Sequence, residues 1–541
     1  MTETGGKKPT GTAAPQTASK ADLATLARGG RINFMGFVIR LIARLPFLFI
    51  GGQIYGAAAL GRFAYAVLIV ELAAQLASLG LKRGLAQQLA EDGRPHSHIV
   101  ADAMLTALFG SVVGMVILGS FPQAMFPNSA INGWEWMLPV TVLAIAWTDI
   151  ALAALAYHNN VGATVRARSI VEPWTISAVA LLWSYWSLRD GLIIAYVISM
   201  VAALIAALIP LAREFGVPRG WRPNLGLSWR TARRNMPLAA ADAVEWGSRR
   251  IDIAVLGLFL GPKYVGIYYV AQQVASLPAK LKTSFDPVLG PVIARNLAVN
   301  DLGAVAAQVR QVGFWILAAQ AGIALALALP GHAVMALVGA DFTVGTATLG
   351  FLLAAEVIAA TAVVSEAALI YVSRHKNMAL SLTMLALQAA LSAMFIIAMR
   401  KLDWPEAWQA TGPAAALCVA LAFASIAKSR LLGKTIGHSV SGWRWALVLA
   451  IVAGFAIGIP VRLFLPPLVQ LLLGIPLIFA TFGYVIWTRG FGREDRMLFR
   501  MRKADIEVLA ASAAAARSSM SALRILNSNR SSGPKPRVQM T

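Results

Sequence analysis

The chain has 541 residues, of which 58% are hydrophobic and 13% charged, and its formal net charge is +22. Its mean hydropathy is +0.66. A soluble domain is nearer half apolar and a quarter charged, so the composition excludes a soluble protein and predicts an all-α polytopic membrane protein. In such a protein basic loops orient the helices, and no nucleic-acid partner is expected. The single cysteine, Cys418, excludes an internal disulfide, and no Cys/His spacing suggests a metal or cofactor.

The first thirty residues are polar and contain neither an apolar core nor a cleavage site, so we interpret 1–30 as a disordered cytoplasmic leader. Fourteen hydrophobic segments follow. They were identified with a window of about 20 residues, the length that a membrane-spanning helix needs. They lie at 32–54, 62–81, 100–121, 135–157, 169–187, 191–212, 237–260, 264–286, 310–330, 344–372, 378–399, 408–427, 444–463 and 467–488.

Loop charge predicts the direction of these spans. If the leader is inside, the loops on its side carry 37 of the 47 Lys and Arg residues, whereas the opposite loops carry six. Cytoplasmic loops concentrate Lys and Arg, so the pattern supports fourteen spans with both termini in the cytoplasm. The tail opens with RGFGREDRMLFRMRKADIEVL, which is basic with apolar residues at near-helical spacing. It is expected to lie on the inner leaflet.

An internal repeat emerges when the chain is shifted by 205 residues. The matched pairs are Arg28/Arg233, Arg44/Arg249, Gly56/Gly261, Gly61/Gly266 and Phe63/Tyr268. Both copies run in the same direction, which indicates two pseudo-symmetric six-helix lobes followed by two helices, with coincidence as the alternative explanation. The predicted parts are an N-lobe at 31–212, a basic linker at 213–235, a C-lobe at 236–430, two spans within 431–488 and a basic cytoplasmic tail at 489–541.

Four arginines fall inside predicted spans. Arg40 and Arg44 are four residues apart and share a helix face in the first span, and Arg249 and Arg250 lie in DAVEWGSRRID of the seventh. On one continuous helix, Asp242, Glu245, Arg249 and Asp252 would occupy a stripe roughly 80° wide. A charge facing lipid near the bilayer centre costs about 2.5–3.5 kcal/mol, so these groups should face protein or water.

Carboxylates in other spans supply opposite charge. They are Glu71, Asp149, Glu172, Glu356 and Glu366. One interpretation is local pairing near the ends of the spans, and for Glu172 this structural role is favoured. The other is a central aqueous cavity with cationic groups in each lobe. Arginine stays charged and binds phosphate in bidentate fashion, so such a cavity suits an anionic substrate.

Several stretches resemble a known family. The opening GGRINFMGFVIRLIARL, the stretch RRIDIAVLGLFLGPKYVGIYYV, the passage LPGHAVMALVGADF and the exit WTRGFGREDRMLF resemble bacterial Wzx-type polysaccharide-biosynthesis flippases. These belong to the multidrug/oligosaccharidyl-lipid/polysaccharide (MOP) exporter superfamily. The resemblance covers roughly residues 28–500 and rests on glycines and apolar spacing.

The resemblance implies a non-enzymatic flippase in the bacterial inner membrane. Its substrate would be undecaprenyl-pyrophosphate-linked oligosaccharide, such as a repeat unit of O-antigen or exopolysaccharide. By position, the substrate-binding candidates are Arg40, Arg44, Arg249 and Arg250. The candidates for ion coupling or cavity lining are Glu71, Asp149, Asp242, Glu245, Asp252, Glu356 and Glu366. The polysaccharide polymerase and the glycosyltransferases are candidate protein partners.

Other classes remain as alternatives. A lipid II flippase of peptidoglycan synthesis belongs to the same superfamily and also fits fourteen spans. A multidrug cation antiporter would need acids without so many arginines, and a channel fits the two-lobe repeat less well. A membrane polymerase, ligase or glycosyltransferase would commonly carry a large outer loop or a D-x-D motif, and this sequence has neither. The tripeptide GKT at 433–435 lacks the glycine that a phosphate-binding loop needs at 428.

Overall fold

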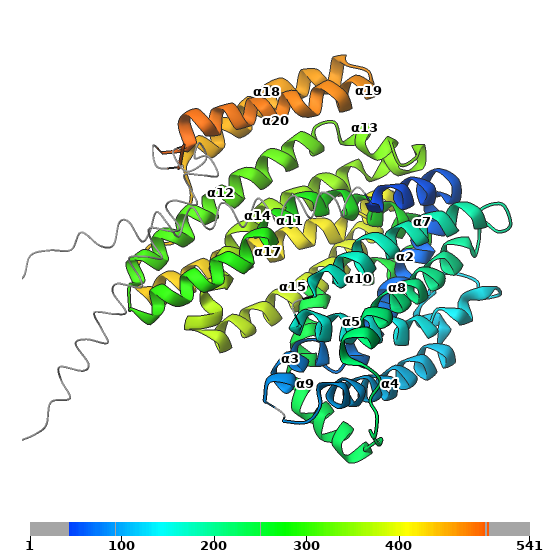
Figure 1. The fold of residues 1–541 in the computed structure, drawn as a ribbon. Helices are drawn as coiled ribbons and strands as arrows, with labels where there is room; N and C mark the ends of the chain where they lie inside the picture. The colour runs from blue at the N-terminus through cyan, green and yellow to red at the C-terminus, as the bar shows by residue number, and fades with distance from the viewer. Residues whose placement is uncertain (1–42, 92, 159, 249, 493–494, 497–541) are drawn as a thin grey trace, which may run out of the picture.

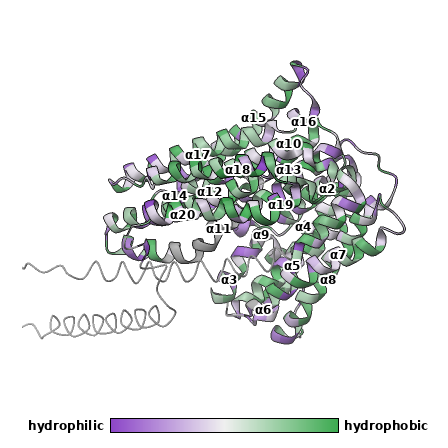
Figure 2. Cartoon of the chain, turned by 90° about the horizontal axis from the view of Figure 1, so that it is seen from above, coloured by the Kyte–Doolittle hydropathy of each residue, from purple (hydrophilic) through white to green (hydrophobic). Residues whose placement is uncertain are grey.

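The computed structural model describes residues 43–91, 93–158, 160–248, 250–492 and 495–496. Within these ranges every regular element is a helix (Figure 1). Apolar residues cover the long helices, and hydrophilic residues gather at helix ends and connections (Figure 2). Hydrocarbon offers the backbone no hydrogen-bond partners, so an apolar chain that crosses it folds into helices. The predicted all-α polytopic fold class is confirmed.

Ten helical segments of the described chain are long and apolar enough to cross a membrane. One of them, Ala43–Glu91, covers the first two predicted spans. The three predicted spans outside these ten are also largely helical, and they are 169–187, 237–260 and 264–286.

The N-lobe begins with helical residues 43–50, which continue into a π-helical turn, η1. Its elements are η1 (Gly51–Tyr55), α2 (Gly56–Ala77), α3 (Leu81–Glu91), α4 (His96–Ser120), η2 (Pro122–Ala124), η3 (Trp134–Met137), α5 (Val140–Tyr157), α6 (Val161–Val165), η4 (Arg166–Val171), α7 (Glu172–Trp183) and α8 (Gly191–Phe215). Gly56 has φ 82°, a left-handed conformation that favours glycine, where the chain turns from η1 into α2.

The C-lobe begins with a helix that starts inside the predicted basic linker. Its elements are α9 (Leu225–Ser248), α10 (Ile251–Phe259), α11 (Pro262–Ala298), α12 (Leu302–Ala328), α13 (Gly331–Ala336), η5 (Ala340–Gly345), α14 (Thr346–Val372), α15 (Arg374–Lys401), α16 (Glu406–Gln409) and α17 (Gly412–Ile436). The last elements are α18 (Trp445–Phe464), α19 (Pro467–Val469), η6 (Gln470–Gly474), α20 (Ile475–Val485) and η7 (Ile486–Gly490). The helices α18 and α20 pack on each other and on α12.

The seventh predicted span is two helices and not one. The helix α9 ends at Ser248, and Arg250 has φ −138° and ψ −3°, so the helical path restarts only at Ile251. The expected single stripe of Asp242, Glu245, Arg249 and Asp252 is therefore wrong. The acids before the break lie on α9, where Asp242 pairs with Arg83 of α3, whereas Asp252 lies on α10, where it accepts a hydrogen bond from Tyr268 of α11.

The two lobes share one hydrophobic core at one end and have separate cores at the other. The shared core joins α2, α5 and α8 to α10, α11 and α14. A second core belongs to the N-lobe alone, around Leu85, Ile99 and Ile150. A third lies among the C-lobe and the final helices, around Val309 and Leu447. The shared end is the end of the first and seventh spans, so it corresponds to the face that loop charge predicts to be outer.

Two glycines allow the lobes to close at this end. A Cβ atom on Gly61 of α2 would lie 1.8 Å from the carbonyl oxygen of Pro262, and one on Gly266 of α11 would lie 2.0 Å from that of Ala57. Both distances are far inside van der Waals contact, so only hydrogen fits at either position. Gly61 and Gly266 are one of the pairs matched by the internal repeat. We call this backbone contact the glycine seal.

A buried carboxylate, that of Asp495, anchors the chain just after the last span. Asp495 accepts hydrogen bonds from Gln311 at 2.7 Å, from the Trp315 indole at 3.0 Å, from the Gly492 amide at 3.0 Å and from Arg444 at 3.3 Å. Burial alone would raise the pKa of Asp495, but these hydrogen bonds outweigh it and hold the pKa below its ordinary value. The exit from the last span is therefore fixed to α12.

Replacing Asp495 by asparagine should destabilise the protein by about 1–3 kcal/mol at pH 7, because a charged acceptor of several hydrogen bonds is lost. A carboxylate whose pKa is lowered by folding stabilises the folded protein fully when the pH is above its unfolded-state pKa of about 3.9. This stabilisation is lost as the pH falls through the folded-state pKa. Thermal unfolding in detergent should show a gap between wild type and Asp495→Asn that is full at pH 7 and shrinks below about pH 4. A gap independent of pH would contradict this account.

Candidate functional site

Arg44 lies on the first described helical segment and faces α7 of the same lobe. Its Nη2 is 3.4 Å from the Glu172 carboxylate, and the Arg44 side chain is 55% exposed. Glu172 is the first residue of α7. An exposed guanidinium held by a single carboxylate can exchange that partner for another anion. Arg40, the other candidate on this span, lies outside the described residues.

Arg168 joins two carboxylates, although in the sequence it is one of the basic residues of a predicted inner loop. Its Nη1 donates to Glu172 at 3.0 Å and its Nη2 to Asp149 at 2.5 Å. Lys82 at the start of α3 approaches Asp149 at 3.6 Å. Arg168 belongs to the π-helical segment η4 that leads into α7, which brings it to the α5 carboxylate. Its spacing of four residues from Glu172 is the sequence signal that could have revealed it.

Arg250 pairs with an acid of the opposite lobe. Its Nη2 lies 3.1 Å from the Glu71 carboxylate of α2, and both side chains are about 30% exposed, at 32% and 29%. The Tyr269 hydroxyl interacts electrostatically with Arg250, Arg44 and Glu71. Arg250, unlike Arg44, therefore links the two lobes directly. Arg249 lies outside the described residues.

These groups form one array. Tyr196 of α8 lies within electrostatic range of Glu71, Glu172, Arg168 and Arg250, so the Arg168 group and the Arg250 group lie near each other. We define the central charge network by the members of this array, Arg44, Glu71, Asp149, Arg168, Glu172 and Arg250. Three of its six members are arginines and three are carboxylates, and Lys82 beside Asp149 adds one positive charge at its edge. Its arginines can receive an external anion when a carboxylate is protonated or withdrawn.

A second ionic contact joins α3 to α9. Arg83 donates from Nε to Asp242 at 2.6 Å and from Nη2 to Glu245 at 2.5 Å. A Cβ on Gly84 would lie 2.1 Å from the Asn235 side-chain oxygen, so α9 approaches α3 closely here. Asp242 and Glu245 therefore hold α9 against the N-lobe, at the end away from the glycine seal. We call this contact the Arg83 clasp.

Three predicted carboxylates lie elsewhere. Asp252 is buried and accepts a 2.6 Å hydrogen bond from the Tyr268 hydroxyl and a 3.3 Å bond from Gln272. Glu366 pairs with Lys428 at 2.9 Å inside the C-lobe, and Glu356 is half-buried on α14. Among the described residues, no group of three or more His, Cys, Asp or Glu side chains is placed to hold a metal ion.

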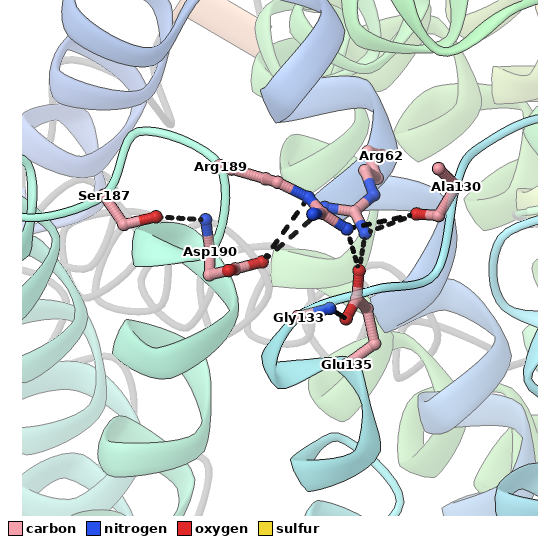
Figure 3. A network of polar contacts seen from close by, with 7 residues as sticks. All are labelled: Arg62, Ala130, Gly133, Glu135, Ser187, Arg189 and Asp190. Carbon is pink, nitrogen blue, oxygen red and sulfur yellow. Dashed lines mark hydrogen bonds and ion pairs between the residues drawn. The ribbon is translucent and has the colours of Figure 1, made fainter.

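An ion-pair network beside the glycine seal was also missed by the sequence analysis (Figure 3). The buried Glu135 carboxylate accepts from Arg62, the neighbour of Gly61, and from Arg189 at 2.7 Å. Asp190 lies 3.8 Å from Arg62 Nη1. These contacts fix two N-lobe connections to α2. In the sequence Arg62 and Arg189 are two of the six basic residues of the predicted outer loops. Their shared pairing with Glu135 depends on the tertiary fold.

The connection after α4 also reaches the C-lobe. Asn128 donates to the carbonyl oxygens of Gly257 at 2.8 Å and Leu260 at 3.2 Å. Gln53 donates to the carbonyl oxygen of Leu337 at 2.9 Å. Side chains of the N-lobe therefore reinforce the glycine seal through hydrogen bonds to the C-lobe backbone.

The structure is that of a helical membrane protein with two lobes closed at one face and a charged network between them. Solved transporters share this fold. An inward-facing multidrug-resistance MATE-family transporter of the MOP superfamily has a TM-score of 0.60 and 13% identity, with 74% of this chain and 94% of that chain covered. The lipid II flippase MurJ in an inward closed conformation has a TM-score of 0.62 and 12% identity, with 84% and 99% covered. A MOP-superfamily transporter from Pyrococcus furiosus has a TM-score of 0.51 and 12% identity, with 80% and 99% covered.

A sequence family adds a more particular finding. Residues 54–298 match the family described as polysaccharide biosynthesis protein. No curated protein sequence matches the chain. The family match and the shared fold confirm the resemblance to polysaccharide flippases of the MOP superfamily.

Proposed function

We propose that this protein is a flippase that moves undecaprenyl-pyrophosphate-linked oligosaccharide from the inner to the outer leaflet of the bacterial inner membrane. The observation that carries the proposal is the convergence of Arg44, Arg168 and Arg250 in one network, while the glycine seal closes the opposite face. A pyrophosphate has several oxygens that guanidinium groups can bind in bidentate fashion. The polysaccharide-biosynthesis family match over 54–298 supports a glycan as the cargo.

Carboxylate exchange would control access to the arginines. Glu172 forms ion pairs with both Arg44 and Arg168, and Glu71 forms an ion pair with Arg250. Protonation or movement of these acids as the substrate enters would release the guanidinium groups to the pyrophosphate. Glu71, Asp149 and Glu172 are therefore the proposed coupling carboxylates. Arg40 and Arg249 remain proposed substrate ligands from the sequence.

The membrane potential favours the proposed direction. It is negative inside, so an anion that moves outward gains about 2.3 kcal/mol per charge per 100 mV. The two lobes would rock about the network from the arrangement seen here, in which the glycine seal and the Arg83 clasp are both formed. The clasp would open to admit the substrate while the seal holds, and the seal would part to release it while the clasp holds. The polyprenyl chain would stay in lipid throughout.

Deletion of the gene tests the proposal in cells. Lipid-linked oligosaccharide should accumulate in the inner leaflet and surface polysaccharide should be lost, and wild-type protein should restore both. Unchanged surface polysaccharide with no accumulated intermediate would overturn the proposal.

Combining Arg44→Ala with Arg250→Ala should lower transport more than either single change does. Each single change leaves two network arginines, whereas the double change leaves only Arg168 among those described. We expect the double variant to lower transport by at least about tenfold, the effect of losing about 1.4 kcal/mol of anion binding. Surface glycan should be measured against protein level. Normal glycan in the double variant would assign these arginines to structural pairing.

The alternative function is lipid II transport in peptidoglycan synthesis. The MurJ fold match, with 84% of this chain covered, is the observation that favours it. Depletion of the protein distinguishes the two functions. Cell lysis would favour lipid II transport, whereas viable cells without surface polysaccharide would favour the glycan flippase.

A further inference from the structure

A groove on the surface of the N-lobe runs between η4 and α8, which pack against each other. It has a volume of about 370 Å³. Its lining residues are Arg166, Ala202, Ile205, Ala206, Ile209 and Pro210. We call it the α8 groove. It contains no member of the central charge network.

The wall that α8 contributes is a single apolar stripe. Its residues are spaced three and four apart, so they share one face of the helix. Ala202 and Ala206 are small and leave room between the larger Ile205 and Ile209, which are 53% and 48% exposed. Pro210 lies inside α8, where proline bends a helix, and the opposite wall η4 is π-helical. Small side chains and two irregular walls together account for the groove.

The groove is as deep as most of one lipid leaflet. From Ala202 to Pro210 the helix rises about 12 Å, at roughly 1.5 Å per residue. The helix α8 is one of the candidate membrane spans, and one leaflet contributes about 15 Å of hydrocarbon, half of the ~30 Å core. Loop charge predicts the Pro210 end to be the inner one. The stripe therefore follows the path of an acyl chain in the inner leaflet.

Two arginines lie at the inner end of the groove. Arg166 is the first residue of η4, just before the fifth predicted span. Arg213 follows Ala202 by eleven residues, so it lies about 20° from Ala202 around the helix and extends the same stripe inward. Both arginines are exposed, and neither pairs with a carboxylate among the residues that the structure describes. Glu214, next to Arg213, approaches His158 at 4.0 Å instead.

We propose that the α8 groove binds an acidic phospholipid, with its phosphate at Arg166 and Arg213 and one acyl chain along the stripe on α8. The order of the groups selects this occupant, because the cations lie at the level of the headgroups and the apolar wall extends from them toward the bilayer centre. Free phosphate would leave the apolar wall uncovered. A zwitterionic lipid would bring a further positive charge to the arginines.

The lipid would hold together two elements of the N-lobe. Arg168, two residues after Arg166, donates to Asp149 and Glu172 on the protein side of η4. A ligand that binds only the folded state stabilises it, so bound lipid is expected to raise the thermal stability of the protein. Transport per molecule depends on Arg168 and not on Arg166, so loss of the lipid should lower stability without lowering that rate.

The test uses full-length purified protein in a neutral detergent, titrated with dioleoylphosphatidylglycerol or dioleoylphosphatidylcholine and followed by native mass spectrometry. Arg166→Gln/Arg213→Gln removes the two cations at the groove. Arg219→Gln/Arg222→Gln removes the same charge from exposed positions after α8, outside the lining. We expect phosphatidylglycerol binding to weaken about thirtyfold in the first variant, equivalent to about 2 kcal/mol for two basic residues. The matched variant should bind nearly as wild type does.

A second variant tests the apolar wall without changing any charge. Ala202→Leu/Ala206→Leu fills the space in which the acyl chain would lie. We expect it to weaken phosphatidylglycerol binding by at least about tenfold, because the chain loses its apolar contact. Wild-type protein should bind phosphatidylcholine at least about tenfold more weakly than phosphatidylglycerol.

Four results would overturn the proposal. Equal weakening in the two arginine variants would show general charge attraction without a site, and unchanged binding in the filled variant would show that no chain lies in the groove. Displacement by millimolar inorganic phosphate would assign the arginines to a soluble phosphate compound. Displacement by equimolar undecaprenyl phosphate would assign the groove to a polyprenyl lipid. Because the readout is lipid binding and not glycan transport, its result is independent of the proposed flippase activity.

Discussion

Gly61→Val is expected to abolish transport while the protein still reaches the membrane. A Cβ at this position would lie 1.8 Å from the Pro262 carbonyl oxygen and 2.4 Å from the Gly266 nitrogen. Both are backbone atoms of α11, so no side chain can rotate away to relieve the clash. The lobes must separate at the seal, and the protein is trapped with its predicted outer face open. A carrier that cannot close one face cannot complete alternating access.

Cysteine labelling can detect the trapped state. With the native Cys418 replaced by serine, Val265→Cys places a thiol at a buried position beside the seal, where valine is 2% exposed. Labelling by a membrane-impermeant maleimide should rise on the order of tenfold when Gly61→Val is added, because the open state becomes dominant. Gly350→Val is the matched control, since a Cβ there meets nothing within 4 Å. Normal transport by Gly61→Val would show that the seal is not part of the cycle.

Arg168→Gln is the second change with a large expected effect. It removes the guanidinium that donates to both Asp149 and Glu172, and leaves these partly buried carboxylates with only Lys82 and Arg44 nearby. Removing one partner of a buried ion pair lowers the free energy of unfolding by about 3–5 kcal/mol. The Arg168 side chain is 22% exposed, so we expect a loss at or below the lower end of that range. We expect transport to fall by at least about a hundredfold, equivalent to about 2.7 kcal/mol. Glycan output per unit of membrane protein measures it.

A double substitution that preserves the net charge distinguishes a structural role of Arg168 from a role in substrate binding. Arg168→Gln combined with Asp149→Asn removes one positive and one negative group, so no uncompensated charge is added to the network. Asp149→Asn alone is the reference, because Asp149 is itself a proposed coupling carboxylate. If Arg168 only neutralises its neighbours, the combination should transport as well as Asp149→Asn does. If Arg168 contacts the pyrophosphate, the combination should transport less than Asp149→Asn while protein stability recovers. Arg166→Gln, at an exposed position two residues away, should leave transport unchanged.

The repeated glycines were the part of the sequence that predicted how the two lobes are related. The repeat aligned Gly61 with Gly266 before either could be placed, and the structure brings the two backbones together. Local periodicity could not reveal the end of α9 at Ser248, because apolar and charged residues continue across it at helical spacing. Asp252 was therefore grouped with Asp242, although the two lie on different helices with different partners.

The candidate site was predicted less completely. In-span charge drew attention to Arg44, Arg250, Glu71 and Asp149, and all four lie in the central charge network. Arg168 was counted with the loop charges because it precedes the apolar run of its span. Its partner Asp149 is nineteen residues earlier, and Arg250 and Glu71 come from different lobes. Pairings of this kind depend on how the helices pack, and a single sequence does not specify that packing.

The central claim is that this protein carries a pyrophosphate-linked glycan across the bilayer through its arginine network. Its most direct test is transbilayer movement in vesicles that contain only the purified protein, with a fluorescent polyprenyl-pyrophosphate oligosaccharide in one leaflet. Wild-type protein should move the label to the opposite leaflet, faster when a membrane potential favours outward anion movement, and the Arg44→Ala/Arg250→Ala variant should fall close to protein-free vesicles. Equal movement in wild-type, variant and protein-free vesicles would contradict the account.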